Sequence, residues 1–326
     1  MGQRARVALA SVAMVVASTS LALLAGEAIL RARNASMKNY DIEMWRYALQ
    51  LKRRSDIPIL GHEHVASKSA VLQSVGIRIN EKGLRGGPVR AAADGHRRIL
   101  FLGSSVTMGW GVPEADTLTA RVERMLKAAG RDVEVLNAGI GNYNAVRYVE
   151  RFKRRLADLA PNDIVVHYFL RDAETLDAGG GNWLLRHSQL AVTTWVAFSR
   201  FFGKYSEKSL EEHYRAVYQP DAEGYKAMRR ALQELAAHAR DHNQRLFLAM
   251  TPDVHDLVDY KFGYIHEIMR KIAEEDGYAY VDLLPGMRNL TPAQLWSMPG
   301  DPHPNGLGHR LMAEAIFPAL KQTPNP

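Results

Sequence analysis

A serine that follows a short apolar run is the first feature of the sequence that could do chemistry. Residues 98–102 (RILFL) lead into Gly103, Ser104 and Ser105, and a glycine-rich stretch follows at 106–112. A serine just past the carboxyl end of a predicted strand is exposed at the mouth of a sheet, and backbone N–H groups of such a turn can face an anion. The segment lacks the Gly-Lys-Ser/Thr of a nucleotide-binding loop. It therefore predicts a nucleophile, a phosphate-binding turn or a merely structural turn.

A histidine near the other end of the chain could supply the base that a serine nucleophile needs. Asp301, His303 and His309 lie in the sequence DPHPNGLGH, which precedes the last predicted helix. His303 can accept the serine proton because imidazole titrates near neutrality, and Asp301 can hold the ring in the right tautomer. His309 is predicted to lie on the helix with a structural role. His62 and His64 are metal-ligand types without a supporting cluster, so we predict a structural role and no metal site.

Alternating strands and helices must position these residues. From residue 97 onwards, apolar periodicity predicts strands at 98–102, 133–136, 163–170, 245–250 and 278–283, and helices at 118–129, 145–159, 222–240, 264–275 and 308–320. This alternation is typical of a parallel sheet with helices on both faces, and five strands fit a flavodoxin-like, doubly wound order. Ligands of such α/β sheets bind at the carboxyl ends of the strands, which is where Ser105 is predicted to lie.

Together these residues resemble the SGNH (GDSL) hydrolase superfamily over about residues 97–320. The order is that of the family, with the serine after the first strand and the histidine before the final helix. The family's first block reads Gly-Asp-Ser, so Ser105 matches the nucleophile and Ser104 replaces the aspartate. The fourth block usually reads Asp-x-x-His, whereas Asp301 and His303 are two positions apart. The resemblance implies an SGNH hydrolase fold and a serine-dependent carboxylic ester hydrolase that needs no metal or organic cofactor.

The resemblance also implies an oxyanion hole, with one departure from the family pattern. The second block contributes a glycine N–H, and the matching stretch at 137–144 (NAGIGNYN) places Gly141 or Asn142 there, beside the Ser105 N–H. The third block is Gly-x-Asn-Asp in the family but Phe-Leu-Arg-Asp here, so Arg171 stands where the family has asparagine. Arginine can donate hydrogen bonds to an oxyanion or hold an anionic substrate, and it can also point elsewhere and leave a weakened or inactive enzyme.

The N-terminus predicts a membrane helix. Residues 7–30 form a mostly apolar run of 24 residues with two arginines on either side, and about 20 apolar residues cross the hydrocarbon core of a bilayer. A signal peptide cleaved after the small-x-small sequence at 20–22 (SLA) is the competing interpretation. A tail of six residues before a first helix usually stays inside. We therefore expect a single-pass protein of the inner membrane, with its catalytic domain in the periplasm or another extracytoplasmic space.

Three parts are expected along the chain. Residues 1–33 form the anchor or signal, and residues 34–96 form an extension that packs on the main domain. The extension is predicted to contain a helix at 41–52 and a strand or hairpin at 70–80, with 91–95 as a linker.

The SGNH hydrolase domain is assigned to residues 97–326, with an insertion at 175–221 that interrupts the alternation of strands and helices. The insertion includes three glycines at 179–181 and an apolar, aromatic segment at 190–202. This segment is predicted to cover the site, to meet a membrane or a partner, or to belong to the ordinary core.

The substrate is narrowed by a second, local resemblance. Residues 27–31 (EAILR) and 80–86 (NEKGLRG) look like a subgroup of membrane-anchored bacterial SGNH proteins tied to cell-surface polysaccharides. This likeness implies hydrolysis or transfer of an O-acyl group on an acylated extracytoplasmic glycan. A lipid esterase or lysophospholipase is the alternative that the aromatic residues at 190–202 suggest. A non-catalytic domain that binds glycan or scaffolds a complex is the alternative that Arg171 suggests.

The composition excludes other classes of chemistry. The chain has 326 residues, 47% hydrophobic and 24% charged, as expected for a folded protein. The absence of cysteine excludes disulfides, thiolate metal sites, a cysteine nucleophile and a lipid anchor on cysteine. The net charge is +7, but Lys and Arg are scattered and no nucleic-acid-binding motif is present. We predict a solvated basic surface and no nucleic-acid partner.

Overall fold

Five parallel strands form the central sheet of the protein, whose computed structural model describes residues 2–91, 95–176, 182–202 and 207–322. Their spatial order is β6-β5-β7-β8-β9, and every neighbouring pair is parallel. This is the flavodoxin-like, doubly wound order, so the predicted fold class is confirmed. The strands are β5 (Arg97–Gly103), β6 (Val133–Asn137), β7 (Asp163–Tyr168), β8 (Arg245–Met250) and β9 (Ala279–Asp282).

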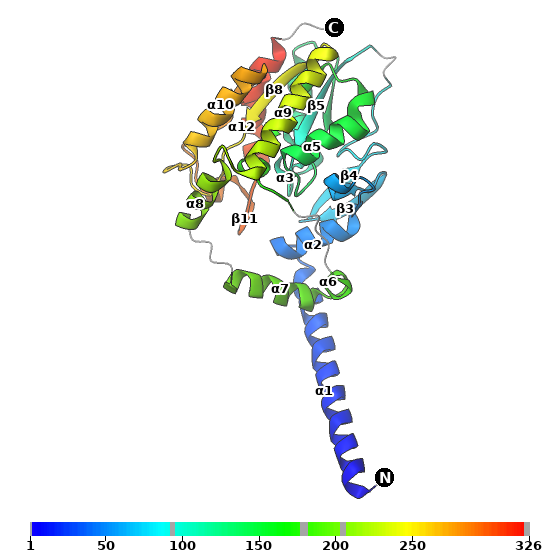
Figure 1. Cartoon of the computed structure of the whole chain (residues 1–326). Helices are drawn as coiled ribbons and strands as arrows, with labels where there is room; N and C mark the ends of the chain where they lie inside the picture. The colour runs from blue at the N-terminus through cyan, green and yellow to red at the C-terminus, as the bar shows by residue number, and fades with distance from the viewer. Residues whose placement is uncertain (1, 92–94, 177–181, 203–206, 323–326) are drawn as a thin grey trace. The chain divides into compact units, whose positions relative to one another are not determined.

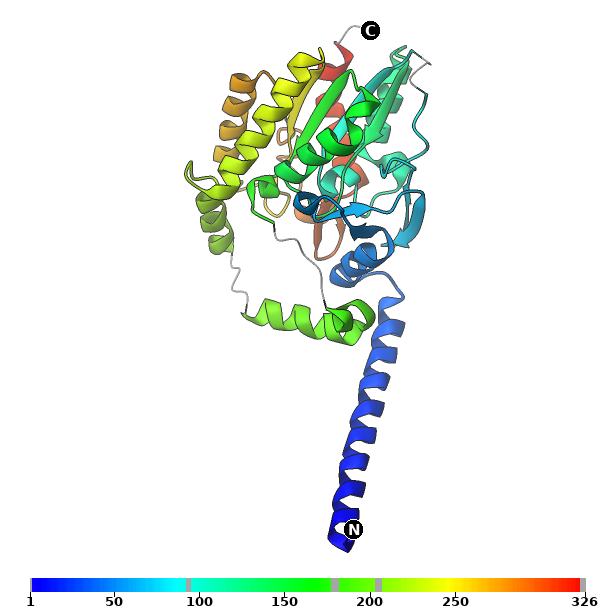
Figure 2. The ribbon, with the colours of Figure 1, turned by 45° about the vertical axis from the view of Figure 1, so that its right-hand side comes forward.

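Helices cover both faces of the sheet because the strands are apolar on both faces. Ile99 and Phe101 of β5 belong to one buried cluster, and the alternating Leu100 and Leu102 belong to the other. Figures 1 and 2 show the sheet between these two layers of helices. The first cluster includes residues of α4 (Leu118–Ala128) and α12 (Gly306–Lys321), and the second includes residues of α5 (Ala145–Arg151), α9 (Glu223–Asp241) and α10 (Gly263–Asp276).

Two predicted elements differ in detail from the structure. The stretch 145–159 is helical throughout, but only α5 is α-helical, and a π turn (Phe152–Leu156) and a 3-10 turn (Ala157–Leu159) complete it. The third strand ends at Tyr168 rather than at residue 170, because the chain turns into the short helix η6 (Leu170–Ala173). The Asp172 side chain accepts the Phe169 N–H at 3.0 Å through Oδ2 and so fixes the start of this turn.

The extension forms small antiparallel elements. These are α2 (Tyr40–Gln50), the pair β1 (Lys52–Arg54) and β2 (His62–His64), the 3-10 turn η1 (Pro58–Leu60), and the hairpin β3 (Lys68–Leu72) and β4 (Val75–Ile79). Gln73 and Ser74 join the hairpin with positive φ angles of 49° and 60°, as a tight two-residue turn requires. Of the linker expected at 91–95, residues 92–94 lie outside the described part of the chain.

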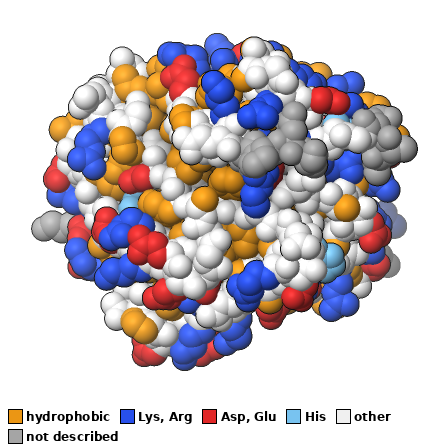
Figure 3. Space-filling view, turned by 90° about the horizontal axis from the view of Figure 1, so that it is seen from above, with side chains coloured by type: hydrophobic (Ala, Val, Ile, Leu, Met, Phe, Trp, Pro, Cys, Tyr) orange, Lys and Arg blue, Asp and Glu red, His pale blue; other side chains and the backbone are white. Residues whose placement is uncertain are grey.

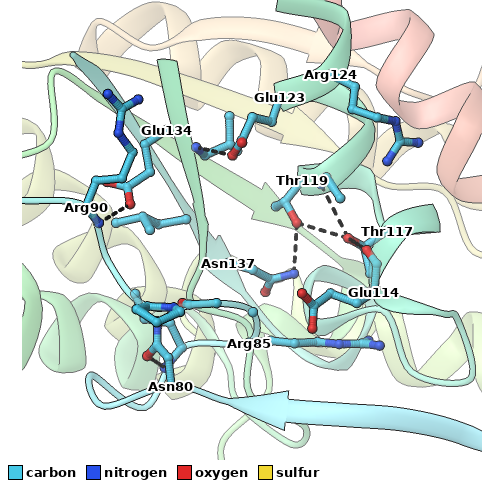
Figure 4. Close-up of a pocket in the computed structure, with 17 residues that line it drawn as sticks. Asn80, Arg85, Arg90, Glu114, Thr117, Thr119, Glu123, Arg124, Glu134 and Asn137 are labelled. Carbon is cyan, nitrogen blue, oxygen red and sulfur yellow. Dashed lines mark hydrogen bonds between the residues drawn. The ribbon is translucent and has the colours of Figure 1, made fainter. Parts of the chain in front are cut away.

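The outer edge of the sheet is covered by the end of the extension. Arg85 donates its N–H to Asn137 O at 3.0 Å, and Arg90 donates its N–H to the Glu134 carboxylate at 2.6 Å. A pocket of about 330 Å³ remains along β6 beside these contacts, and Figure 4 shows the polar side chains that line it. An edge strand covered in this way offers less free backbone to another chain. Ser105 does not line this pocket.

The chain divides into two compact units, residues 1–46 with 180–204 and residues 47–179 with 205–326. The first contains α1 (Gln3–Asn34), α6 (Trp183–His187) and α7 (Gln189–Phe202), so the middle of the predicted insertion shares a unit with the N-terminal helix. Among the described helices, α1 alone is long and apolar enough to cross a membrane, with a mean hydropathy of 2.2 over 18 residues. The three glycines at 179–181 lie outside the described residues.

The remaining described helices lie in the larger unit. They are α3 (Ser105–Met108), η3 (Glu114–Asp116), α8 (Glu207–Val217) and α11 (Pro292–Leu295), and a last hairpin pairs β10 (Trp296–Met298) with β11 (Asp301–Pro304). Figure 3 shows Lys and Arg side chains interspersed with Asp and Glu, and exposed ion pairs such as Arg310–Glu314 occur. The face in view therefore presents mixed charge rather than a continuous basic surface.

Candidate active site

Ser105 begins a short helix directly after the central strand β5. A side chain at Gly103 would place its Cβ 2.0 Å from Thr107 Oγ1 and 2.8 Å from His167 O, so this position accepts only glycine. The tight turn brings the chain from β5 into α3, and Met108 N–H closes the first turn on Ser104 O at 3.0 Å. Ser105 is the first residue of α3, where backbone N–H groups lack partners within the helix. The half-buried Ser105 thus lies at the carboxyl edge of the sheet.

Ser105, His303 and Asp301 form one chain of hydrogen bonds. His303 Nε2 lies 2.8 Å from Ser105 Oγ, and His303 Nδ1 lies 2.6 Å from Asp301 Oδ1. Because a carboxylate accepts the Nδ1 proton, we assign the tautomer that leaves Nε2 free to accept the serine proton. This is the arrangement of nucleophile, base and orienting acid that activates a serine.

The short spacing between Asp301 and His303 is compatible with this geometry. Asp301 Oδ1 also accepts the backbone N–H of His303 at 3.1 Å, so the carboxylate bonds to both the backbone and the ring two residues on. Such a turn is a local preference of aspartate. The two residues lie on β11, in the hairpin that precedes α12. An Asp-x-His sequence therefore reaches the same contact for which the family uses Asp-x-x-His.

The second oxygen of Asp301 has two partners that the sequence did not reveal. Gln73 Nε2 donates to Asp301 Oδ2 at 2.6 Å, and Ser297 Oγ donates to the same oxygen at 2.9 Å. The Asp301 side chain is fully buried. Burial opposes its ionisation, but the hydrogen bonds from His303 and Gln73 outweigh burial and hold the Asp301 pKa below its ordinary value. Asp301 is thus kept ionised, and its orientation is fixed by four hydrogen bonds.

In the stretch 137–144, which corresponds to the second block of the family, the backbone N–H of Asn142 is available as a donor and that of Gly141 is not. Gly141 donates its buried N–H to Tyr47 Oη at 3.1 Å, and its carbonyl accepts from Lys52 Nζ at 2.7 Å. The next residue, Asn142, is exposed and adopts a positive φ of 65°, and its N–H has no hydrogen-bond partner among the described residues. Of the two residues predicted as oxyanion donors, Asn142 is the better placed, because the Gly141 N–H already donates to Tyr47.

Arg171 is turned onto an acidic neighbour. Its Nε lies 3.2 Å from the Glu174 carboxylate, and its side chain is 56% exposed. The neighbouring Asp172 is buried and bonds to the Phe169 N–H, and burial raises the Asp172 pKa well above its usual range. Asp172 is thus a structural acid of the turn. The position that the family gives to an asparagine donor holds a guanidinium with a carboxylate partner of its own.

The other histidines have structural contacts. His309 Nδ1 accepts the Leu118 N–H at 2.9 Å at the start of α4, and His64 Nε2 lies 2.6 Å from Tyr47 Oη. Burial lowers the pKa of His309 and His64 well below the ordinary value, so both are neutral at pH 7. Within the described residues, no group of three or more His, Asp or Glu could hold a metal ion.

A buried arginine of the extension holds the loop after α3. The Arg85 guanidinium donates to three carbonyl oxygens, Met108 O at 2.6 Å, Gly109 O at 2.5 Å and Val112 O at 2.5 Å. The five donors of a guanidinium are spread over a planar fork and can reach carbonyls at separate positions, whereas the three donors of a lysine all radiate from one nitrogen. Arg85 lies in the stretch 80–86 that resembles membrane-anchored SGNH proteins, and that likeness was the one sequence signal that could have pointed to it.

Comparison with known proteins gives the following matches. A family model described as "GDSL-like Lipase/Acylhydrolase family" matches residues 101–311. No curated protein matches the chain. The crystal structure of TesA is 15% identical and covers 69% of this chain and 99% of its own, with a TM-score of 0.47. The acetyl xylan esterase AlAXEase is 17% identical and covers 68% and 99%, with a TM-score of 0.43. A catalytic mutant of Axe2, an acetylxylan esterase from Geobacillus stearothermophilus, is 17% identical and covers 68% and 93%, with a TM-score of 0.46.

Proposed function

Because the chain belongs to the GDSL-like lipase/acylhydrolase family, we propose that it is an acyl-ester hydrolase or acyl transferase with Ser105 as its nucleophile. The observation that carries the proposal is the 2.8 Å contact between His303 Nε2 and Ser105 Oγ. A base within hydrogen-bonding distance can remove the hydroxyl proton as the oxygen attacks. The buried Asp301 supports the same role by holding the imidazole from its other side.

The proposed reaction has two steps. Ser105 Oγ attacks the ester carbonyl while His303 takes the serine proton, and the C–O bond to the alcohol then breaks as His303 returns that proton to the leaving oxygen. Water, or a sugar hydroxyl, next attacks the acyl carbon of the acyl-serine and loses its proton to His303. The bond between that carbon and Ser105 Oγ then breaks as His303 returns the proton to Oγ, which releases the acid or the new ester and restores the free serine. Asp301 stays ionised and stabilises the imidazolium between the two proton transfers.

Two backbone donors suit the negative charge of the tetrahedral intermediate. The N–H of Ser105 at the start of α3 and the N–H of the exposed Asn142 are the ones we assign to the oxyanion. Arg171 has Glu174 as a partner, so in this proposal it contributes less to the oxyanion than the family asparagine does. The proposed site therefore has a catalytic base with all its hydrogen-bond partners but fewer oxyanion donors than the family pattern.

The substrate that we propose is an O-acyl group, such as an acetyl ester, on an extracytoplasmic glycan. The apolar helix α1, the positive residues around it and the likeness of residues 27–31 and 80–86 to anchored SGNH proteins support a periplasmic or extracytoplasmic catalytic domain on an uncleaved anchor.

A lipid ester is the second candidate substrate. It is favoured by the exposed aromatic side chains of α7, among them Trp195 and Phe198, which belong to the same unit as α1. An enzyme acting on membrane lipids would use such a surface to reach its substrate.

A series of nitrophenyl esters with acyl chains from acetyl to long fatty acyl separates these functions. The purified full chain and the Ser105→Ala variant are compared, followed by release of acetate from an acetylated glycan. Rapid, Ser105-dependent cleavage of the acetyl ester supports the glycan esterase. Activity restricted to long chains supports the lipid esterase instead. No Ser105-dependent turnover on any ester, by protein with native circular dichroism, overturns the proposal in favour of a non-catalytic binding domain.

A further inference from the structure

The carboxylate of Glu27 holds the start of α7 against the end of α1. Glu27 accepts the N–H groups of Gln189 and Leu190 at 3.0 and 2.9 Å and the hydroxyl of Ser188 at 2.9 Å. The first N–H groups of a helix need such an acceptor, and the helix dipole favours a negative charge there. Arg31 binds the same carboxylate at 2.7 Å. An acidic residue in an otherwise apolar run is therefore explained by the helix that it caps.

Two more contacts fix the insertion to the N-terminal segment. Asn34 Nδ2 donates to Gln189 Oε1 at 3.0 Å in a buried position, and Trp45 Nε1 donates to Leu185 O at 2.6 Å. Because a buried amide that loses its hydrogen-bond partner destabilises the structure, this bond favours the arrangement in which Asn34 and Gln189 stay together. Residues of α6 and α7 are thus attached to α1 and its continuation by several bonds between segments far apart in sequence.

The second half of α7, beyond its contacts with Glu27 and Asn34, is aromatic and exposed. Trp195, Phe198 and Phe201 are 58%, 55% and 82% exposed, whereas Gln189 and Val192, near the start of the same helix, are buried. Residues three apart fall along one side of a helix, so the three rings form a stripe that continues the row of Gln189 and Val192. Neighbouring α6 adds two further exposed apolar side chains, Trp183 and Leu184. A patch of large aromatic residues of this kind marks a contact surface.

The level of α7 relative to a bilayer follows from Glu27. The apolar run of residues 7–30 is about 36 Å long as a helix, and the hydrocarbon core is about 30 Å thick. Glu27, near the end of that run, then lies at the boundary between hydrocarbon and headgroups. The first residue of α7, Gln189, is hydrogen-bonded to Glu27, and α7 runs across the axis of α1 in both ribbon views (Figures 1 and 2). The helix α7 therefore lies along that boundary.

We propose that α7 is an interfacial helix whose Trp195, Phe198 and Phe201 side chains insert among the lipids of the leaflet that holds the end of α1. This inference rests on the proposed retention of α1 as a membrane anchor. Lipid is the occupant we favour because Glu27 fixes α7 at the depth where tryptophan and amphipathic helices are stabilised. The hydrolase chain would then have a second attachment to the membrane, through its own insertion.

Single cysteines carrying a polarity-sensitive fluorophore test this placement, because the chain has no cysteine of its own. Phe198→Cys probes α7, Val16→Cys probes the middle of α1, and Val258→Cys probes an exposed site of the larger unit. Each labelled full chain is reconstituted in phosphatidylcholine and phosphatidylglycerol vesicles. Lipids with a quencher near the headgroup or deep in the acyl chain, and aqueous iodide, are then compared.

The proposal predicts that shallow lipid quenchers reduce the fluorescence of the Phe198 probe several-fold, and that aqueous iodide reduces it little. The Val16 probe responds to the deep quencher. A Phe198 probe that is open to iodide while Val16 is quenched would overturn the inference and leave the anchor intact. A Val16 probe that no lipid quenches would overturn the anchor and the inference together. Protection of Phe198 that disappears on dilution of protein in lipid would assign the stripe to a second copy of the chain instead.

Glu27→Ala supplies an independent check on the capping contact. Without the carboxylate, the start of α7 loses three hydrogen-bond acceptor contacts, so shallow quenching of the Phe198 probe should fall at least about twofold. The Val16 and Val258 probes report whether the anchor and the larger unit are unchanged. Equal quenching of the Phe198 probe with and without Glu27 would contradict the capping role.

Discussion

The two halves of the candidate site are built to different degrees. On the proton-transfer side, Ser105, His303 and Asp301 are joined at 2.8 and 2.6 Å, and both oxygens of Asp301 are occupied. On the oxyanion side, the Gly141 N–H is engaged by Tyr47, and the Arg171 side chain lies against Glu174. The first half is preorganised, whereas the second half, as we propose it, relies on two backbone donors and lacks the asparagine of the family.

From this difference we infer that stabilisation of the oxyanion, rather than deprotonation of Ser105, limits the rate of the proposed reaction. A connected base lowers the barrier to deprotonating the serine, but the tetrahedral intermediate also needs donors for its oxyanion. One oxyanion donor is worth about two to three orders of magnitude in rate. We therefore expect an activated serine with a modest turnover rate. Removing a group from the proton-transfer half should lower kcat, whereas restoring the family residue in the oxyanion half should raise it.

The largest change is expected from Asp301→Asn, which leaves the volume unchanged but presents an amide to His303. The amide can fix the tautomer with the proton on Nε2, so the ring no longer accepts the serine proton, and kcat should fall about 10³–10⁴-fold. Ester hydrolysis under substrate saturation measures this loss. A decrease of less than about tenfold would mean that Asp301 does not orient the base.

The oxyanion half is tested by Arg171→Asn, which restores the family residue. If a donor is missing, kcat should rise about 10–100-fold. Arg171→Ala is the matched control, and it should change kcat by less than about threefold because the guanidinium already has Glu174 as a partner. A fall of two orders of magnitude in Arg171→Ala would contradict this account and make Arg171 itself an oxyanion donor.

A smaller effect is expected from Gln73→Leu on the proton-transfer side. Loss of the 2.6 Å bond to Asp301 Oδ2 raises the Asp301 pKa toward its ordinary value and loosens its orientation. The decrease in kcat should be about 3–10-fold, and the acid limb of the pH–rate profile should move to higher pH. Gln73→Glu adds a second negative charge beside Asp301 and should move the limb further. An unchanged profile in both variants would reduce Gln73 to a packing residue.

The last prediction concerns His167, whose replacement should change the pH dependence of stability rather than the rate of the reaction. Burial lowers the pKa of His167, whose Nδ1 lies 3.0 Å from Thr107 Oγ1, to about 3. The unfolded chain therefore binds a proton more readily between pH 3 and 6.5, and the free energy of unfolding falls as the pH drops through that range. His167→Asn should make this dependence shallower by up to about 1.4 kcal/mol per pH unit. Chemical unfolding of the solubilised chain at several pH values measures the slope, and an identical slope would contradict the neutral state of His167.

The fold was predictable because its signals are local. Buried parallel strands such as β5 and β7 are mostly continuous apolar runs, and the alternation of five such strands with helices predicted the flavodoxin-like sheet. The order of the motifs along the chain indicated the family. The serine, histidine and aspartate were named from their types and their places beside predicted elements, and the structure brings them within hydrogen-bonding distance. Their catalytic roles remain predictions.

The supporting residues were not predictable from local patterns. Gln73 reaches Asp301 across 228 positions of sequence, and Arg85 reaches the carbonyls that follow α3 from the extension. Neither contact follows from periodicity. The choice between Gly141 and Asn142 depends on a backbone angle and on the hydroxyl of Tyr47, which only the folded chain defines.

The most direct measurement is covalent labelling of the full chain by a fluorophosphonate, followed by intact mass, beside Ser105→Ala and His303→Ala. The account predicts one adduct per wild-type chain and none at Ser105→Ala, with labelling of His303→Ala slowed at least about 10³-fold. Equal labelling of wild type and Ser105→Ala, or no labelling of folded wild-type protein, would contradict an activated Ser105 and with it the proposed chemistry.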